Sequence, residues 1–244
     1  MKCLIVGASA GLGRALAEHL AAAGHDLFLV ATDERDLAAT AAHLSLLCGV
    51  HVSYAATDLA DVDAAALRQQ VLSSLGSIEA LFYVAGLGVE EDRGQLPDRI
   101  VERLVAVNFL AGVRIVNAFL PDLAARRTAW CVGVGSVAAV RGRGSNMVYG
   151  ASKRGLEFYF EALRHHLRDT ACTVQFYRLG YMSTAMLAGR ARGPLPAAEL
   201  DEVARRIVAD MARGGGMRYL PRWWFYVCTA VRLLPWSLFK RASF

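Results

Sequence analysis

The sequence lacks close cysteine pairs and any cluster of cysteine with histidine. Its five cysteines are scattered along 244 residues: Cys3, Cys48, Cys131, Cys172 and Cys228. This spacing excludes a disulfide-rich secreted module and predicts no bound metal. Three of these cysteines stand in apolar, strand-like runs, where a thiol packs as a small buried side chain. We therefore expect a reducing, cytoplasmic compartment.

Long apolar runs and low-complexity segments are also absent. The apolar run 223–231 has nine residues, far fewer than the roughly 20 that a spanning helix needs. A strand-like run begins at residue 2, so we expect no signal peptide ahead of the fold. The length and the 55% hydrophobic content are typical of one domain with a substantial core.

Acidic residues are missing from the end of the chain. Beyond Asp210 there is no Asp or Glu, and six basic residues follow there: Arg213, Arg218, Arg222, Arg232, Lys240 and Arg241. The net charge is +5, so the rest of the chain sums to −1. Because the basicity is local, the sequence does not predict a nucleic-acid partner.

Apolar runs of strand length alternate with longer segments of helical period. We expect strands at about 2–6, 26–31, 51–55, 79–84, 129–135, 172–178 and 217–220. We expect helices at about 12–23, 34–47, 62–74, 98–124, 147–168 and 197–213. This alternation predicts a Rossmann-type, doubly wound parallel α/β sheet over 1–216, which binds ligands beyond the carboxyl ends of its strands. The last strand and a basic, aromatic tail make up 217–244.

A glycine-rich turn joins the first strand to the first helix. In "LIVGASAGLGRALAEHL", Gly7, Gly11 and Gly13 leave the backbone open to a pyrophosphate. The helix that follows directs its free N–H groups and its positive dipole end at the same place. A tight turn without a ligand is the alternative, but the position at the first strand of an α/β chain favours nucleotide binding.

One segment, "SVAAVRGRGSNMVYGASK", contains a serine, a tyrosine and a lysine at informative spacings. Tyr149 and Lys153 are four apart, so they share a helix face, and Ser136 ends the fifth strand. A phenol beside an ammonium has its pKa drawn down from about 10, and it can then give a proton to a carbonyl oxygen. Ser136 can hydrogen-bond that oxygen. The alternative is a surface tyrosine and a solvated lysine.

The spacing G-x-x-x-G-x-G resembles the short-chain dehydrogenase/reductase family. Further elements of its pattern follow in order: Asp58 in "ATDLAD", "YVAGLG", Asn108 in "VNFLAG" and "RLGYMSTAM". Tyr83 and Val84 replace two asparagines of the family's Asn-Asn-Ala-Gly element, and Leu179 replaces the usual proline. The resemblance spans residues 2 to about 188.

The resemblance implies an NAD(P)-dependent oxidoreductase in which Tyr149 is the acid/base and Lys153 lowers its pKa and holds the nicotinamide ribose. Ser136 would orient the substrate, and Asn108 would support a water relay behind Lys153. A homodimer or homotetramer through the helices at 98–124 and 147–168 is also implied. The residues assigned to the cofactor are Gly7, Ser9, Gly11, Leu12, Gly13, Thr32, Arg35, Asp58, Leu59, Ala85, Gly86, Tyr149, Lys153, Gly180 and Thr184.

The end of the second strand favours NADP(H) over NAD(H). Ala31 stands where a chain that prefers NAD usually places an acid for the ribose 2′-OH, and Thr32 can hydrogen-bond a phosphate. Against this, Ala10 replaces a basic residue often found in the glycine turn, and Asp33 and Glu34 have only Arg35 nearby to offset them. NAD(H) therefore stays open as an alternative.

Two arginine pairs flank the expected substrate side. Arg141 and Arg143 precede Tyr149, and Arg190 and Arg192 lie in "LAGRARGPLP". Guanidinium pairs of this kind bind phosphate or pyrophosphate, although solvated loop charge is the alternative.

The ending "MRYLPRWWFYVCTAVRLLPWSLFKRASF" mixes aromatic and basic residues, as interfacial membrane segments do. A lid over the cleft or an oligomer interface is the alternative. With "MVYGASKRGLEFYFEAL", this ending is similar to the subgroup of the family that reduces decaprenylphosphoryl keto-sugars. The similarity implies a hydrophobic or lipid-linked keto-sugar substrate and a peripheral place on the inner face of the cytoplasmic membrane.

Two other functions remain open. One keeps the chemistry and assigns a soluble ketone or 3-oxoacyl substrate. The other is a nucleotide-binding interaction protein without turnover, which the altered "YVAG" and "RLG" elements favour and the intact Asn108, Ser136, Tyr149 and Lys153 oppose.

Overall fold

A single parallel sheet forms the centre of the computed structural model, which describes residues 1–89, 92–183 and 196–241. The strand order is β3-β2-β1-β4-β5-β6-β7, and all neighbouring strands are parallel. The strands are β1 (Lys2–Val6), β2 (Asp26–Ala31), β3 (Val52–Ala56), β4 (Ala80–Tyr83), β5 (Ala129–Ser136), β6 (Cys172–Leu179) and β7 (Gly216–Leu220). The order reverses between β1 and β4, which places a ligand crevice beyond that point.

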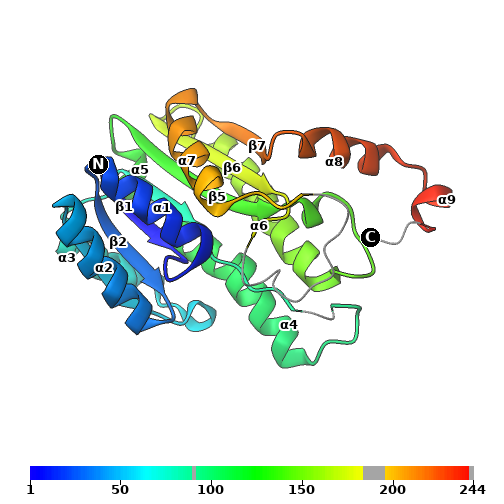
Figure 1. The fold of residues 1–244 in the computed structure, drawn as a ribbon, viewed down its shortest axis with the longest axis horizontal. Helices are drawn as coiled ribbons and strands as arrows, with labels where there is room; N and C mark the ends of the chain where they lie inside the picture. Colours follow the sequence, from blue (N-terminus) through cyan, green and yellow to red (C-terminus); the bar gives the residue numbers. More distant parts are fainter. Residues whose placement is uncertain (90–91, 184–195, 242–244) are drawn as a thin grey trace.

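Helices cover both faces of the sheet (Figure 1). They are α1 (Gly11–Ala22), α2 (Glu34–Cys48), α3 (Ala64–Leu75), α4 (Asp98–Val105), α5 (Ala111–Ala124), α6 (Met147–His166), α7 (Leu200–Asp210), α8 (Trp224–Leu233) and α9 (Trp236–Phe239). One core cluster lies between the sheet and α3, α5 and α6. The other lies between the sheet and α1, α2 and α7. The expected Rossmann-type α/β fold is confirmed.

The central strands are apolar along almost their whole length because helices bury both of their faces. All four residues of β4 are buried, as are the last four of β1. In the edge strand β3, by contrast, no residue is buried. The expected boundaries of all seven strands agree with the structure to within one residue.

The structure differs from expectation in three helical regions. The segment expected as one helix at 98–124 is α4, a π-helical turn at Ala106–Leu110, and α5. The helix expected at 197–213 begins only at Leu200 and ends in a 3₁₀ turn, Met211–Arg213. The tail, read from sequence as an interfacial, lid or interface segment without assigned elements, contains α8 and α9.

The continuous helical stretch Asp98–Ala124 is long and apolar enough to span a membrane by length and composition alone, with a mean hydropathy of 1.7. In this fold 44% of its apolar window is buried. Ile115, Val116 and Phe119 from this stretch belong to the core between the sheet and α3, α5 and α6. The stretch therefore serves as a core helix here.

Candidate active site

A cleft of about 550 Å³ opens beyond the carboxyl ends of the central strands. Its walls come from the turn after β1, the ends of β2, β4, β5 and β6, and the first turns of α6. The predicted residues that line it are Gly7, Ser9, Gly11, Leu12, Gly13, Thr32, Leu59, Ala85, Gly86, Ser136, Arg143, Tyr149, Lys153 and Gly180. The volume is in the range of small-molecule and cofactor pockets.

The turn between β1 and α1 is built for close backbone approach. A Cβ on Gly13 would lie 2.0 Å from the carbonyl oxygen of Gly7, so only glycine lets α1 pack this tightly on the strand. Gly7 has φ +97° and sits against the backbone of Ala85. No side chain caps α1 at Ala10, and its first turn holds no acidic residue. Its N–H groups are thus left for an anion, which fits the pyrophosphate of a dinucleotide.

The end of β2 contributes Ala31, Thr32 and Asp33 to the cleft. The Asp33 carboxylate accepts a hydrogen bond of 3.0 Å from the backbone N–H of Asp36 and so caps α2. Its negative charge is therefore partly engaged by the N-terminus of the helix. Arg35 is exposed and is not part of the cleft lining, although sequence reasoning assigned it to the cofactor.

Asp58 lies next to the cleft without lining it, whereas Leu59 does line it. A hydrogen bond from the Ala60 backbone N–H, followed by one from Arg103, lowers the pKa of this exposed carboxyl. The carboxylate therefore stays ionised next to the cleft.

Lys153 is almost fully buried, with 4% of its surface exposed. Its Nζ donates to the Ala85 carbonyl at 3.0 Å and lies 3.5 Å from the Val134 carbonyl. Burial lowers the pKa of this ammonium to about 8. Gly86 makes room for it, because a Cβ there would lie 2.7 Å from Nζ. At neutral pH most of the population remains charged.

Asn108 is fully buried in the π-helical turn and does not itself line the cleft. Its Oδ1 accepts from the Leu87 N–H at 2.7 Å, and its Nδ2 donates to the Leu87 carbonyl at 2.9 Å and to Ser152 Oγ at 3.2 Å. The buried Tyr83 hydroxyl donates to the carbonyl of Val107, immediately before Asn108. The residue that replaces a family asparagine thus anchors the turn that holds Asn108.

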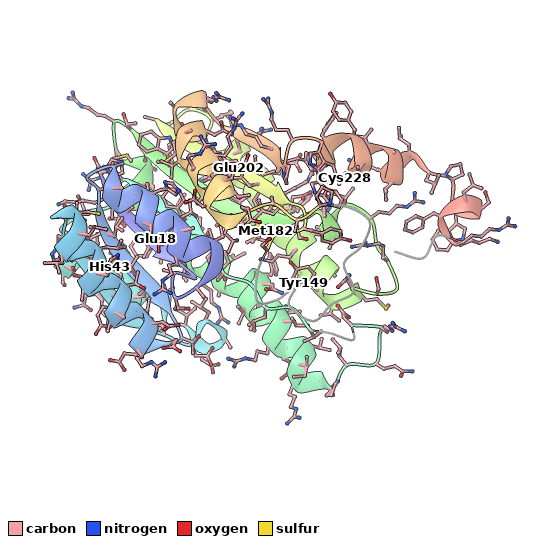
Figure 2. The ribbon with its side chains drawn as sticks, viewed as in Figure 1. Glu18, His43, Tyr149, Met182, Glu202 and Cys228 are labelled. Atoms are coloured by element: carbon pink, nitrogen blue, oxygen red, sulfur yellow. The ribbon has the colours of Figure 1, made fainter. Side chains whose placement is uncertain are left out.

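Ser136, Tyr149 and Lys153 meet in one cleft, as the sequence predicted. Ser136 ends β5, and its Oγ accepts the Ala138 N–H at 3.1 Å, which leaves the hydroxyl proton to donate elsewhere. Figure 2 shows Tyr149 near the middle of the molecule, close to Met182 of the loop after β6. A hydroxyl, a phenol and an ammonium are therefore available to one bound substrate.

The four predicted substrate arginines are distributed differently. Arg143 lines the cleft. Arg141 is engaged elsewhere: its Nη1 donates to the Val231 and Leu234 carbonyls at 2.6 and 2.5 Å, and its guanidinium stacks 3.9 Å from the Phe239 ring centre. Arg190 and Arg192, like the predicted cofactor contact Thr184, lie outside the described residues.

The C-terminal arm, defined as residues 222–241, supports one wall of the cleft. The Trp224 indole packs on Gly180 so closely that a Cβ there would lie 1.7 Å from Nε1. Trp224 also contacts Tyr181 edge-to-face at 5.3 Å, and Tyr181 lines the cleft. Sequence reasoning missed Tyr181, Met182 and Asn146 as cleft residues. The Trp-Trp pair after the last strand was the one signal that a buried anchor lay in the tail.

Known proteins share this architecture. The family model described as short chain dehydrogenase matches residues 2–194. An uncharacterized oxidoreductase of Myxococcus xanthus is 29% identical over 243 residues, which cover 98% of this chain and 95% of that protein. Two further curated relatives are longer, and the chain spans 52% and 62% of their length.

Two solved structures are similar over most of the chain. A short-chain dehydrogenase from Sphingobium yanoikuyae in complex with NADPH has a TM-score of 0.84 at 27% identity, with 99% of this chain and 96% of that chain covered. A short-chain dehydrogenase/reductase from Burkholderia phymatum in complex with NAD also has a TM-score of 0.84, at 22% identity, with 93% and 91% covered. At this identity, the similarity to the Burkholderia phymatum structure shows a shared fold.

Proposed function

The chain belongs to the short-chain dehydrogenase family, and from this premise we propose that it reduces the carbonyl group of a hydrophobic or lipid-linked keto-sugar. It is an NAD(P)-dependent oxidoreductase, and the proposal adds the substrate class, the direction and NADP(H) as the preferred cofactor. The carrying observation is that one cleft joins the glycine turn after β1 to Ser136, Tyr149 and Lys153.

In this mechanism the chain's own residues bind the substrate oxygen and supply the proton. When bound, the nicotinamide cofactor supplies the hydride. Ser136 donates a hydrogen bond to the carbonyl oxygen, where negative charge develops, and Tyr149 gives that oxygen its phenolic proton. The buried Lys153 ammonium stabilises the resulting phenolate and so draws the pKa of Tyr149 toward neutrality. Asn108, through Leu87 and Ser152, holds the backbone behind this pair.

Two features support NADP(H) as the preferred cofactor. Ala31 offers no carboxylate to repel a 2′-phosphate, and the exposed Thr32 hydroxyl can bond one. Asp33 opposes this preference, but its carboxylate is occupied as the cap of α2.

A phosphate-bearing, lipid-linked substrate fits the charge and the surface around the cleft. Arg143 places a guanidinium on the cleft wall, where it can bind a phosphate. The nearby C-terminal arm exposes more than half of each of five apolar side chains, which are Phe225, Tyr226, Leu233, Trp236 and Leu238. Four exposed cations accompany them without any acid: Arg222, Arg232, Lys240 and Arg241. We propose that this arm lies in the interface of an anionic membrane.

A homodimer or homotetramer through the helical segments at 98–124 (α4 to α5) and 147–168 (α6) is part of the proposal. Leu110, the last residue of the π-helical turn before α5, and Phe158, on α6, are exposed apolar side chains of these two segments. A paired copy of the chain would remove them from water.

Replacing Tyr149 by Phe tests the mechanism. We expect kcat with keto-sugar and 3-oxoacyl substrates, measured with NADPH and NADH in parallel, to fall by about 10²–10⁴. Binding of NADPH should persist, because the ring remains. The matched control is Tyr159→Phe, on the same helix, whose hydroxyl bonds Asn117 instead. Undiminished turnover in Tyr149→Phe would show that another group supplies the proton. Activity restricted to 3-oxoacyl substrates would favour the alternative substrate class.

A further inference from the structure

The catalytic helix α6 is capped by a residue far away in the sequence. Asp92, in the segment between β4 and α4, has 1% of its surface exposed. Its Oδ1 accepts from the Val148 N–H at 3.1 Å, and its Oδ2 accepts from the Tyr149 N–H at 2.8 Å. The adjacent residue Asn146, in the position that normally supplies the cap, makes no side-chain cap bond.

In this arrangement the buried carboxylate and the helix N-terminus satisfy each other's hydrogen-bonding needs. The first N–H groups of any helix have no partner within the helix, and a buried carboxylate is costly unless it is hydrogen-bonded. Asp92 meets both needs with two charge-assisted bonds at the positive end of the α6 dipole. Moving the carboxylate would leave the Tyr149 N–H unpaired, so the two residues are held together.

The same segment also contacts the other catalytic groups. The Ala85 carbonyl accepts from Lys153 Nζ, and Leu87 exchanges two hydrogen bonds with Asn108. Asp92 then fixes the backbone of Tyr149. Ala85, Leu87 and Asp92 therefore contact Lys153, Asn108 and Tyr149, which come from two different helical segments.

We propose that Asp92 is a positioning residue that sets the place and the proton affinity of the Tyr149 phenol. The inference rests on the proposed function, since it assumes that Tyr149 supplies the proton. Lys153 on α6 and Arg143 on the preceding loop are the cations that line the cleft with Tyr149. Asp92 instead places a carboxylate at the N-terminus of α6, hydrogen-bonded to the Val148 and Tyr149 backbone, where it offsets the positive end of the helix dipole.

The test compares two capping aspartates. Asp92→Asn keeps the size, removes the charge and accepts only one of the two N–H groups. Asp63→Asn is the matched control, because Asp63 accepts from the Ala65 and Ala66 N–H groups, both at 3.0 Å, at the start of α3. Both variants are assayed for kcat per bound NADPH, so that unfolded protein does not count. In both, the Tyr149 Cζ resonance is followed with pH by ¹³C NMR of the cofactor-bound protein and assigned with Tyr149→Phe.

For Asp92→Asn we expect kcat per bound NADPH to fall by about tenfold or more. The Tyr149 titration should move to lower pH, because a negative charge has been removed. Asp63→Asn should leave both quantities unchanged. Parent kcat and parent titration in Asp92→Asn would overturn the proposal and leave Asp92 as a structural cap. If Asp92→Asn does not fold, Asp92→Ser is judged by the same two readouts. If the parent reduces no carbonyl, the proposed function fails, and the NMR titration alone decides about Asp92.

Discussion

Lys153 is an ammonium held inside the protein by backbone carbonyls. Removal from water favours its neutral form, which is why its pKa falls from 10.5 to about 8. In the proposed mechanism this charge assists proton transfer from Tyr149, so the site would trade folding free energy for function.

Lys153→Met should therefore raise the free energy of unfolding while abolishing turnover. At pH 7 we expect about 1–3 kcal/mol of added stability in denaturant titrations of the cofactor-free protein. The folded pKa lies below the unfolded one, so the unfolded parent binds more protons between about pH 8 and 10.5. Parent stability should gain from this group as pH rises through that window, and the advantage of Lys153→Met should shrink. A difference between the two proteins that is constant from pH 7 to 10.5 contradicts the burial penalty.

At the scale of elements, the C-terminal arm is attached to the fold at defined points. Trp224 packs on Gly180, and Arg141 donates to the carbonyls at the end of α8 while stacking on Phe239. A cation at the C-terminus of a helix satisfies unpaired carbonyls and the negative end of the dipole. Arg141 and Arg143 lie on one loop, so that loop joins the arm to the cleft.

Arg141→Met tests this attachment. Methionine keeps an apolar stem near Phe239 and loses the donors to Val231 and Leu234. We expect trypsin to cleave within the arm, at Arg232 or Lys240, several times faster, as followed by mass spectrometry. The melting temperature of the sheet domain should change little. Arg168→Met, which removes an exposed ion pair with Asp169, is the control. Equal cleavage rates in parent and Arg141→Met would mean that other contacts hold the arm.

At the scale of the whole molecule, the cleft lies near the basic, apolar surface of the C-terminal arm. The reversal of strand order between β1 and β4 opens the cleft, and α8 and α9 extend past β7 from the same sheet (Figure 1). Four of the six basic residues beyond Asp210 lie on that arm, together with its exposed apolar side chains. A chain ended at Gly216 would lose β7 as well, so substitutions test the arm more cleanly than truncation.

Co-sedimentation with vesicles of phosphatidylglycerol and phosphatidylcholine tests membrane contact. We expect the parent protein to bind the vesicles and this binding to weaken with added salt. Each exposed cation near an anionic surface contributes about 1 kcal/mol, and salt screens that attraction. A variant with Tyr226, Leu233, Trp236 and Leu238 replaced by serine should lose binding, and the buried anchors of the arm would remain. The control replaces Leu46 and Leu47, exposed apolar residues of α2, by serine. A parent that stays in the supernatant at low salt would direct the substrate search to soluble ketones and 3-oxoacyl compounds.

The sequence by itself determined most elements of the sheet domain and the spacing of the residues that carry the chemistry. These patterns are local: they comprise the strand and helix periods, the glycine turn and the four-residue separation of Tyr149 and Lys153. They can be recognised in the sequence because residues close together in the chain set the local backbone structure. Tertiary structure alone decided that Asp92 caps the helix of Tyr149, that Tyr83 anchors the turn of Asn108, and that Arg141 holds the arm. Each of these contacts joins residues more than 20 positions apart. No local period encodes such pairs, since they form only once the order of the strands has brought their segments together.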